Sequence, residues 1–201
     1  MTFFKRLKNF ITRRHYGEYR KAFLESIGSE RKFPVDVTIE LSSLCNGRCI
    51  YCYCSDPSKL PFKPGIMDAD IAKKIIDGAA KVGAYSMKFN HRGEPTINPA
   101  FAEIIKYAAS RARGKTLIER FTNTNFKFGI ARDDIFDGFC SMTKVKISYD
   151  SFKEDVFEAQ RAGISHHIVT ANIDKFYNWP GRKTEIVIQA VRTLRNADED
   201  M

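Results

Sequence analysis

The sequence lacks any run of apolar residues close to the roughly 20 that a membrane-spanning helix requires. Its first residues, MTFFKRLKNFITRRHYGEYR, interleave cations with apolar side chains, so they also lack the continuous apolar segment of a secretory signal. These two absences lead us to expect a cytoplasmic protein. In that reducing compartment the five cysteines, an odd number, are better explained as metal ligands or redox groups than as disulfides.

Carboxylates are scarce at the start of the chain. Residues 1–34 contain nine Lys and Arg against three Glu, which accounts for +6 of the net charge of +9. Apolar residues recur at helical spacing over 2–27, which predicts an amphipathic helix packed on the outside of the protein. Contact of this helix with nucleic acid or an acidic membrane is compatible with its charge but is not favoured. We expect a basic helical extension over 1–34 and a core domain over 35–201.

After Pro34 the pattern alternates between strand-like and helix-like segments. Strands are expected at 35–41, 85–90, 116–123, 143–150 and 184–191. Helices are expected at 68–82, 98–113, 131–138, 152–162 and 166–176, with Asn98 as the N-cap of the second. This alternation predicts an α/β fold of about five parallel strands with helices on the outside. Because a closed barrel needs more strands, we expect a partial, open β/α barrel with its ligands at the C-terminal ends of the strands.

Four of the five cysteines lie in one segment, ELSSLCNGRCIYCYC over 40–54. Cys45, Cys49 and Cys52 have the spacing C-x3-C-x2-C directly after the first strand, which allows three thiolates to converge on one soft metal centre. A zinc site normally uses two C-x2-C pairs or two well-placed histidines, and an ordinary ferredoxin cluster uses four cysteines. Three thiolates favour a cluster with one iron open to a ligand. Cys54 is expected to be a free thiol and Cys140 a buried small apolar residue.

The segments that follow the later strands carry a second pattern. The second strand runs into Arg92-Gly93-Glu94-Pro95, the third ends in TNTN (122–125) and the fourth ends in ISYDS (147–151). Together with the cysteine spacing, these segments resemble the signature of the radical S-adenosylmethionine (radical SAM) superfamily over about 35–191. The loop that ends in Gly65-Ile-Met67-Asp68 is similar to that of peptide-modifying members. Arg92 departs from the family pattern, which has a glycine there for a tight turn.

The resemblance implies a [4Fe-4S] cluster on Cys45, Cys49 and Cys52, with S-adenosylmethionine (SAM) bound to the fourth iron. An electron from a flavodoxin- or ferredoxin-like donor would then cleave SAM to methionine and a 5′-deoxyadenosyl radical, which abstracts hydrogen from the substrate. The family places the motif around Glu94 at the amino group of SAM and an aromatic on the adenine. The residues expected to contact SAM are Tyr51, Gly93, Glu94, Pro95, Asn123, Ser148, Asp150 and Gln189. Whether Gln189 faces the barrel interior or an exposed edge stays open.

Three functions remain open from the sequence. The leading one is a radical SAM enzyme acting on a peptide or protein, because the cysteine segment and Met67 resemble members with a SPASM-type C-terminal extension. This chain has no second cysteine cluster of the kind that such an extension carries. The second is a short radical SAM enzyme that installs a glycyl radical or acts on a small molecule such as a deazapurine. The third is a non-catalytic module whose cysteine loop binds zinc and whose basic helix binds RNA.

Overall fold

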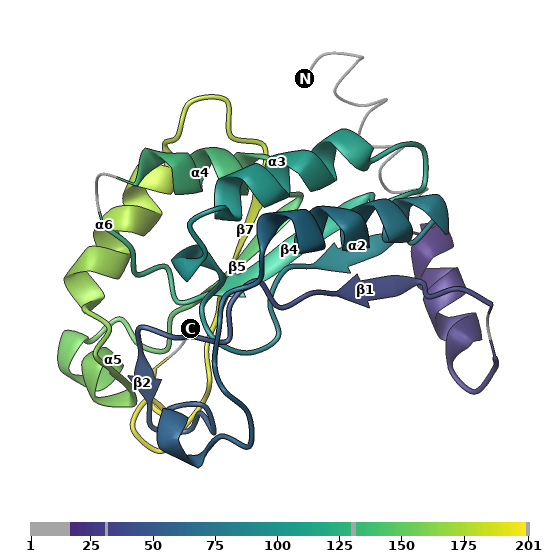
Figure 1. The fold of residues 1–201 in the computed structure, drawn as a ribbon. Helices are drawn as coiled ribbons and strands as arrows, with labels where there is room; N and C mark the ends of the chain where they lie inside the picture. Colours follow the sequence, from purple (N-terminus) through teal and green to yellow (C-terminus); the bar gives the residue numbers. More distant parts are fainter. Residues whose placement is uncertain (1–16, 31, 130–131, 200–201) are drawn as a thin grey trace.

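The computed structural model describes residues 17–30, 32–129 and 132–199, and its centre is a sheet of five strands (Figure 1). In spatial order the strands are β1 (Asp36–Thr38), β3 (Ser86–Lys88), β4 (Glu119–Thr124), β5 (Lys144–Ser148) and β7 (Glu185–Gln189). Every neighbouring pair is parallel. Because β1 and β7 form the two edges, the sheet is open, and the predicted partial barrel of five parallel strands is confirmed.

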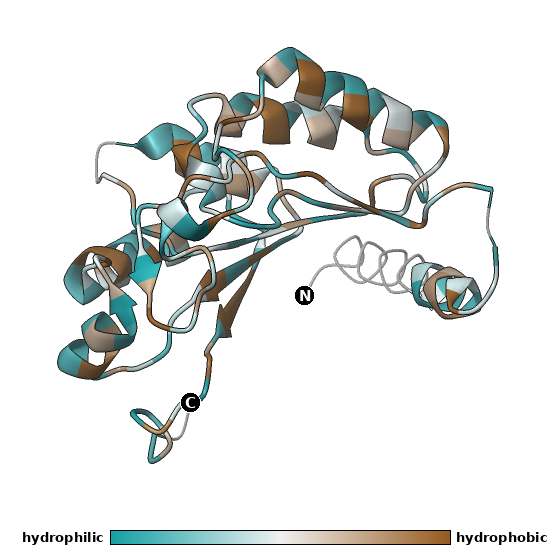
Figure 2. Ribbon diagram, turned by 60° about the horizontal axis from the view of Figure 1, so that its bottom comes forward, coloured by the Kyte–Doolittle hydropathy of each residue, from teal (hydrophilic) through white to brown (hydrophobic). Residues whose placement is uncertain are grey.

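Five helices follow the strands in the predicted order: α2 (Ala69–Lys81), α3 (Phe101–Arg111), α4 (Asp133–Cys140), α5 (Glu154–Gln160) and α6 (His166–Tyr177). Figure 2 shows α2 and α3 side by side on one face of the sheet. In α2 the buried residues Ala72, Ile76 and Ala79 recur at helical spacing and form the stripe that faces the sheet. Two short 3-10 helices, η1 (Pro57–Lys59) and η2 (Pro95–Ile97), lie in the loops after β2 and β3.

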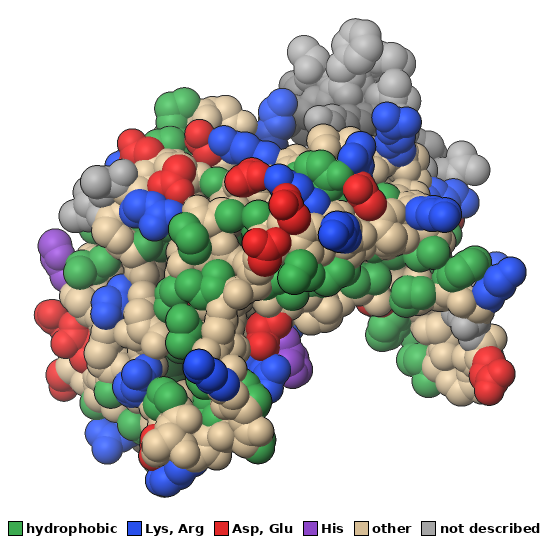
Figure 3. Space-filling model, in the orientation of Figure 1, with side chains coloured by type: hydrophobic (Ala, Val, Ile, Leu, Met, Phe, Trp, Pro, Cys, Tyr) green, Lys and Arg blue, Asp and Glu red, His purple; other side chains and the backbone are tan. Residues whose placement is uncertain are grey.

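The solvent-facing side of α2 and α3 carries cations and carboxylates interleaved, as Figure 3 shows. Lys73 of α2 lies 2.5 Å from Glu103 of α3, and Lys106 lies 3.4 Å from Asp137 of α4. Each such exposed pair contributes about 0 to 1 kcal/mol to the free energy of unfolding. The opposite charges on this surface therefore balance one another but add little to stability.

Buried aromatic side chains pack the segment after β4 against the helices. Phe126 stacks on Phe139 of α4 with 5.2 Å between ring centroids, and its ring lies 5.8 Å from that of Phe176 of α6. Phe126 has φ of +58°, a conformation that a bulky residue rarely adopts, so this packing must stabilise the turn. The turn also fixes the position of Asn125, the residue before it.

The prediction for Asn98 was wrong. Helix α3 begins at Phe101 with Ala100 as its N-cap residue, because η2 occupies the chain up to Ile97. Asn98 is buried instead, and its Nδ2 donates to the carbonyls of Leu41 and Met67, both at 2.9 Å. Its side chain therefore ties the end of the first strand to the entrance of α2.

A second, two-stranded sheet was not predicted. The short strand β2 (Arg48–Cys49) pairs antiparallel with β6 (Arg161–Ala162), which directly follows α5. Strands of two residues have no periodicity that a sequence could reveal. Their pairing holds the cysteine segment against the C-terminal half of the chain.

Residues 17–26 form a helix that packs beside β1. Tyr19 donates its hydroxyl hydrogen to Asp36 at 3.0 Å, Lys115 lies 2.7 Å from Glu18, and Ala22 is buried. The rest of the helix predicted over 2–27 lies outside the described residues. Among the described residues, no helix combines the length and the apolar character needed to cross a bilayer.

Candidate metal and cofactor site

The loop that carries the cysteines is closed at its base. Ser42 and Ile66 form an antiparallel bridge, and the Met67 N–H donates to the Leu41 carbonyl at 3.0 Å. The antiparallel pairing of β2 with β6 then fixes Cys49 opposite Arg161. The loop is thus held at the C-terminal end of β1, where parallel sheets bind their ligands.

Cys45, Cys49 and Cys52 are half-buried free thiols. Burial raises the pKa of Cys45 to about 11, and the Glu94 carboxylate and the nearby thiols of Cys49 and Cys52 contribute to the increase. Iron binds thiolates, so cluster binding must displace the thiol protons. No group of three His, Cys, Asp or Glu within the described residues is arranged to hold a single metal ion, as a zinc site would require. Three neighbouring thiols are the number of protein ligands that a four-iron cluster needs when one iron stays open to another ligand.

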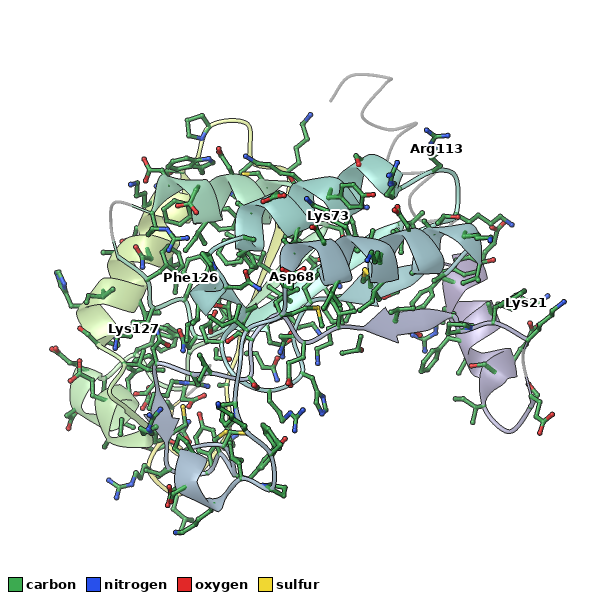
Figure 4. All side chains as sticks on the ribbon, in the orientation of Figure 1. Lys21, Asp68, Lys73, Arg113, Phe126 and Lys127 are labelled. Atoms are coloured by element: carbon green, nitrogen blue, oxygen red, sulfur yellow. The ribbon has the colours of Figure 1, made fainter. Side chains whose placement is uncertain are left out.

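Two side chains donate to the cysteine sulfurs: Asn125 lies in the TNTN segment that the sequence singled out, but no local pattern points to Arg161 or to either contact with sulfur. Asn125 Nδ2 lies 3.9 Å from Cys45 Sγ, and Arg161 Nη1 lies 3.8 Å from Cys49 Sγ. N–H donors to sulfur stabilise negative charge on a thiolate and tune the potential of a cluster. Lys127, labelled in Figure 4, anchors the same region: its Nζ donates to the Gly163 carbonyl at 2.6 Å. The backbone carbonyl of Lys127 accepts a hydrogen bond from Asn46 Nδ2 at 2.9 Å.

The turn after β3 presses directly on the cysteine loop. Gly93 has φ of +60°, and a Cβ added there would lie 2.5 Å from the Leu44 carbonyl oxygen, a distance that no side chain tolerates. The Glu94 N–H donates to that same carbonyl at 2.8 Å. Arg92 does not have a positive φ, so the turn needs a glycine only at Gly93. The Arg92 guanidinium forms a bidentate pair with Glu40 and lies over the ring of Phe62.

Glu94 is almost completely buried and joins the ends of β3 and β4. Its Oε1 accepts from the N–H and the hydroxyl of Thr96 and from the hydroxyl of Thr124, and its Oε2 accepts from the Asn125 N–H at 2.7 Å. Burial raises the pKa of Glu94, although these donors oppose the shift. A carboxylate oxygen accepts two hydrogen bonds, so Oε2 retains capacity for an ammonium hydrogen.

Asp150, at the end of β5, is the second buried carboxylate of the site. Arg161 Nη2 donates to its Oδ1 at 2.9 Å, and the Tyr51 hydroxyl donates to its Oδ2. The Val191 N–H, just after β7, donates to Oδ1 at 2.9 Å. Asp150 therefore orients Tyr51 and Arg161, and no signal along the sequence pointed to that pairing.

Asn123, Ser148 and Gln189 lie together at the C-terminal ends of three neighbouring strands. Asn123 Nδ2 donates to Gln189 Oε1 at 3.2 Å, and Ser148 is in register with Gln189. Gln189 is exposed on the edge strand, and its side chain also reaches across β5 to Asn123. Gln189 therefore combines the exposed edge position with a contact at the end of the sheet. Pro95 is buried as the first residue of η2 and positions the backbone of Glu94. The structure thus brings every predicted site residue to one end of the sheet.

Comparison with known proteins identifies the family of this chain. A model of the radical SAM superfamily matches residues 39–198. Mycofactocin maturase MftC of Mycobacterium tuberculosis is 31% identical over 81 residues, which cover 40% of this chain and 20% of the relative. GTP 3′,8-cyclase of Streptomyces coelicolor is 26% identical over 129 residues, covering 63% of this chain and 36% of the relative.

Among solved structures, Streptococcus suis SuiB bound to S-adenosylmethionine superimposes with a TM-score of 0.66 at 16% identity, covering 90% of this chain and 38% of SuiB. SuiB has also been solved with its precursor peptide SuiA. The chain spans less than half the length of each of these relatives. Because the superfamily model matches well over half of the chain, through the segments that build the site, this chain belongs to the radical SAM superfamily, whose cofactors are a [4Fe-4S] cluster and S-adenosylmethionine.

Proposed function

We propose that this chain binds a [4Fe-4S] cluster through Cys45, Cys49 and Cys52, binds SAM beside it, and abstracts hydrogen from a peptide or protein. The observation that carries the proposal is that three neighbouring thiols lie at the C-terminal end of the sheet, where Asn125 donates to Cys45 and Arg161 donates to Cys49. When bound, the reduced cluster supplies the electron that cleaves SAM to methionine and a 5′-deoxyadenosyl radical.

The residues of the chain bind and orient the cofactors in this proposal. Glu94 offers the free acceptor capacity of Oε2 to the SAM amino group. Tyr51, held by Asp150, presents its ring beside the cysteines for the adenine. Asn123, Ser148 and Gln189 form a polar rim where the ribose and carboxylate of SAM are expected. Because Glu94 and Asp150 are both buried and hydrogen-bonded, their geometry is fixed before SAM binds.

A peptide substrate is supported by two of the similarities: one relative is named a maturase, and SuiB has been solved with a precursor peptide. The similarity to GTP 3′,8-cyclase favours a small-molecule substrate as the second candidate. In either case the electron would come from a flavodoxin- or ferredoxin-like donor, which meets the protein where the cysteine loop is half-exposed.

The proposal is tested by anaerobic reconstitution of the chain with iron and sulfide. We expect a brown protein that releases 5′-deoxyadenosine and methionine from SAM after reduction with dithionite. A colourless protein that retains zinc and leaves SAM intact would contradict the enzymatic function. Faster 5′-deoxyadenosine release with added peptides than with added GTP would support a peptide substrate, and the reverse would favour the small-molecule alternative.

A further inference from the structure

Two lysines stand on the sheet face opposite α2 and α3. Lys88 ends β3, and its neighbours Met87 and Phe89 are completely buried; Lys146 lies in β5 between the completely buried Val145 and Ile147. Because side chains alternate across a strand, both lysines point away from the buried residues beneath the helices. They therefore share the open face of the sheet.

The two lysines flank Phe121 of the strand between them. Phe121 is in register with Lys88, and the Lys146 ammonium lies 5.1 Å from the centre of its ring. Both lysines are half-buried, so the ring forms the floor between two partly desolvated cations. Phe121 offers no charge that could compensate them.

Among the described residues, no carboxylate neutralises Lys88 or Lys146. Within residues 17–30, 32–129 and 132–199, neither Lys88 nor Lys146 lies within ion-pair distance of an Asp or Glu. Lys144, two residues earlier on the same face of β5, lies 3.3 Å from Glu119 and 3.5 Å from Glu185. Burial lowers the pKa of Lys88, and the positive charge of Lys146 lowers it further. On this face of the sheet, Lys144 is therefore paired with carboxylates, whereas Lys88 and Lys146 have no carboxylate partner among the described residues.

Lys88 and Lys146 lie close to the polar rim formed by Asn123, Ser148 and Gln189. Ser148 follows Lys146 by two residues on the same face of β5, a rise of roughly 7 Å along the strand. Asn123, in register with Lys146, donates to Gln189 at that same end of the sheet. A molecule that contacts the rim from the open face would therefore meet Lys88 and Lys146 next.

We propose that Lys88 and Lys146 bind a carboxylate of the substrate, so that the substrate is a peptide that presents an acidic side chain or a free C-terminus to this face. That the substrate is a peptide depends on the proposed function, whereas the binding of an anion depends only on the positions of Lys88 and Lys146. Two ammonium groups without counter-charges are stabilised when two carboxylate oxygens accept their hydrogens. Phe121 between them contacts the apolar atoms that carry the carboxylate.

The test measures the reactivity of individual lysines in the reconstituted protein with SAM, by trace acetylation with isotope-coded acetic anhydride and mass spectrometry. The probes are acetyl-Gly-Asp-Gly-amide, its Asn analogue, acetyl-Gly-Gly-Gly with a free C-terminus, and inorganic phosphate. Lys74, exposed on α2, is the internal reference. We expect a carboxylate peptide to reduce acetylation of Lys88 and Lys146 by about tenfold, since one pKa unit changes the unprotonated fraction tenfold.

The two carboxylate peptides distinguish the sources: protection by the Asp peptide alone assigns an acidic side chain, and protection by the free C-terminus alone assigns a chain end. Equal protection by the Asn analogue, equal protection of Lys74, protection by phosphate alone, or no protection by any probe would each overturn the inference. In the free protein, Lys146→Gln should slow acetylation of Lys88 because a neighbouring positive charge is removed, and it should abolish protection. Lys74→Gln, with the same change in net charge, should leave both effects intact.

Release of 5′-deoxyadenosine without peptide is measured on the same samples and reports on the proposed function separately. Intact SAM cleavage without protection of the lysines overturns only the carboxylate site. Protection without SAM cleavage contradicts only the enzymatic function and leaves the anion site supported.

Discussion

Arg161 and Asp150 form a buried ion pair that links the cysteine loop to the sheet. Arg161 Nε lies 2.9 Å from Asp150 Oδ2, and the two side chains are 7% and 0% exposed. Arg161 also donates to Cys49, and Asp150 accepts from Tyr51 and from the backbone after β7. One pair of charges therefore holds three segments of the site in a single arrangement.

Replacing Arg161 by Met should destabilise the protein by roughly 3–5 kcal/mol, because it leaves the Asp150 carboxylate buried and unpaired. The double variant with Asp150→Asn should recover part of this loss, since no unpaired charge remains. Guanidinium denaturation followed by circular dichroism measures both. Lys106→Met, which breaks the exposed pair with Asp137, serves as the control and should cost no more than about 1 kcal/mol. Equal losses for the two pairs would contradict this account.

Gly93→Ala should prevent the turn after β3 from closing on the cysteine loop, and the iron bound per chain should fall sharply. The new Cβ would meet the Leu44 carbonyl oxygen at 2.5 Å in addition to the strain of φ at +60°. Gly114→Ala is a matched control, because Gly114 has φ of +56° with nothing near the added Cβ. It should cost only the roughly 1–2 kcal/mol of left-handed strain and keep full iron content. Equal iron content in the two variants would show that contact with the loop is unimportant.

Glu94→Gln should destabilise the protein by roughly 1–3 kcal/mol although it removes a buried charge. All four groups around the carboxylate are placed as donors, so the amide NH2 would face another donor. Urea denaturation checks the change in free energy of unfolding. Glu103→Gln on the surface of α3 is the control, with an expected change below about 1 kcal/mol. A neutral or stabilising Glu94→Gln would mean that Glu94 is protonated in the native protein.

Single replacement of Cys45, Cys49 or Cys52 by Ala should abolish the absorbance and iron content of the reconstituted cluster, because we propose that each thiolate binds a separate iron. Cys54→Ala and Cys140→Ala should retain both. Cys54 is buried, and Cys140 is half-buried against the core rather than fully buried as expected. Unchanged iron content in Cys49→Ala would refute the ligand assignment, and loss of iron in Cys54→Ala would add a ligand.

Deletion of residues 1–27 should leave cluster binding and SAM cleavage largely intact if residues 1–34 are a peripheral extension, as we propose. The described part of this segment bonds to β1 through Tyr19 and Asp36, at the first residue of the strand, whereas the cysteine loop follows the other end of that strand. Iron content and 5′-deoxyadenosine release, compared with the full chain, are the measurements. Loss of both in a folded deletion variant would place this helix within the catalytic domain.

Much of the fold follows from local patterns in the sequence. The alternation of strand and helix periodicity determined five parallel strands with outer helices, because such connections leave few other arrangements. Element boundaries were less determined: α3 starts at Phe101, whereas Asn98 Nδ2 donates to the Leu41 and Met67 carbonyls and its Oδ1 accepts from the Ala100 N–H at 2.9 Å. The spacing of Cys45, Cys49 and Cys52 is also local, which is why the sequence alone could predict a metal-binding loop.

The tertiary structure decided which side chains support that loop. Arg161 is 112 positions from Cys49, and Asn125 is 80 positions from Cys45, so no spacing rule connects them. The unmatched pair of Lys88 and Lys146 likewise depends on the register of β3, β4 and β5. The sequence by itself determines chemistry that depends on residues a few positions apart, such as the cysteine spacing. Burial, donors to sulfur and unpaired charges depend on segments far apart in the sequence, so only the tertiary structure decides them.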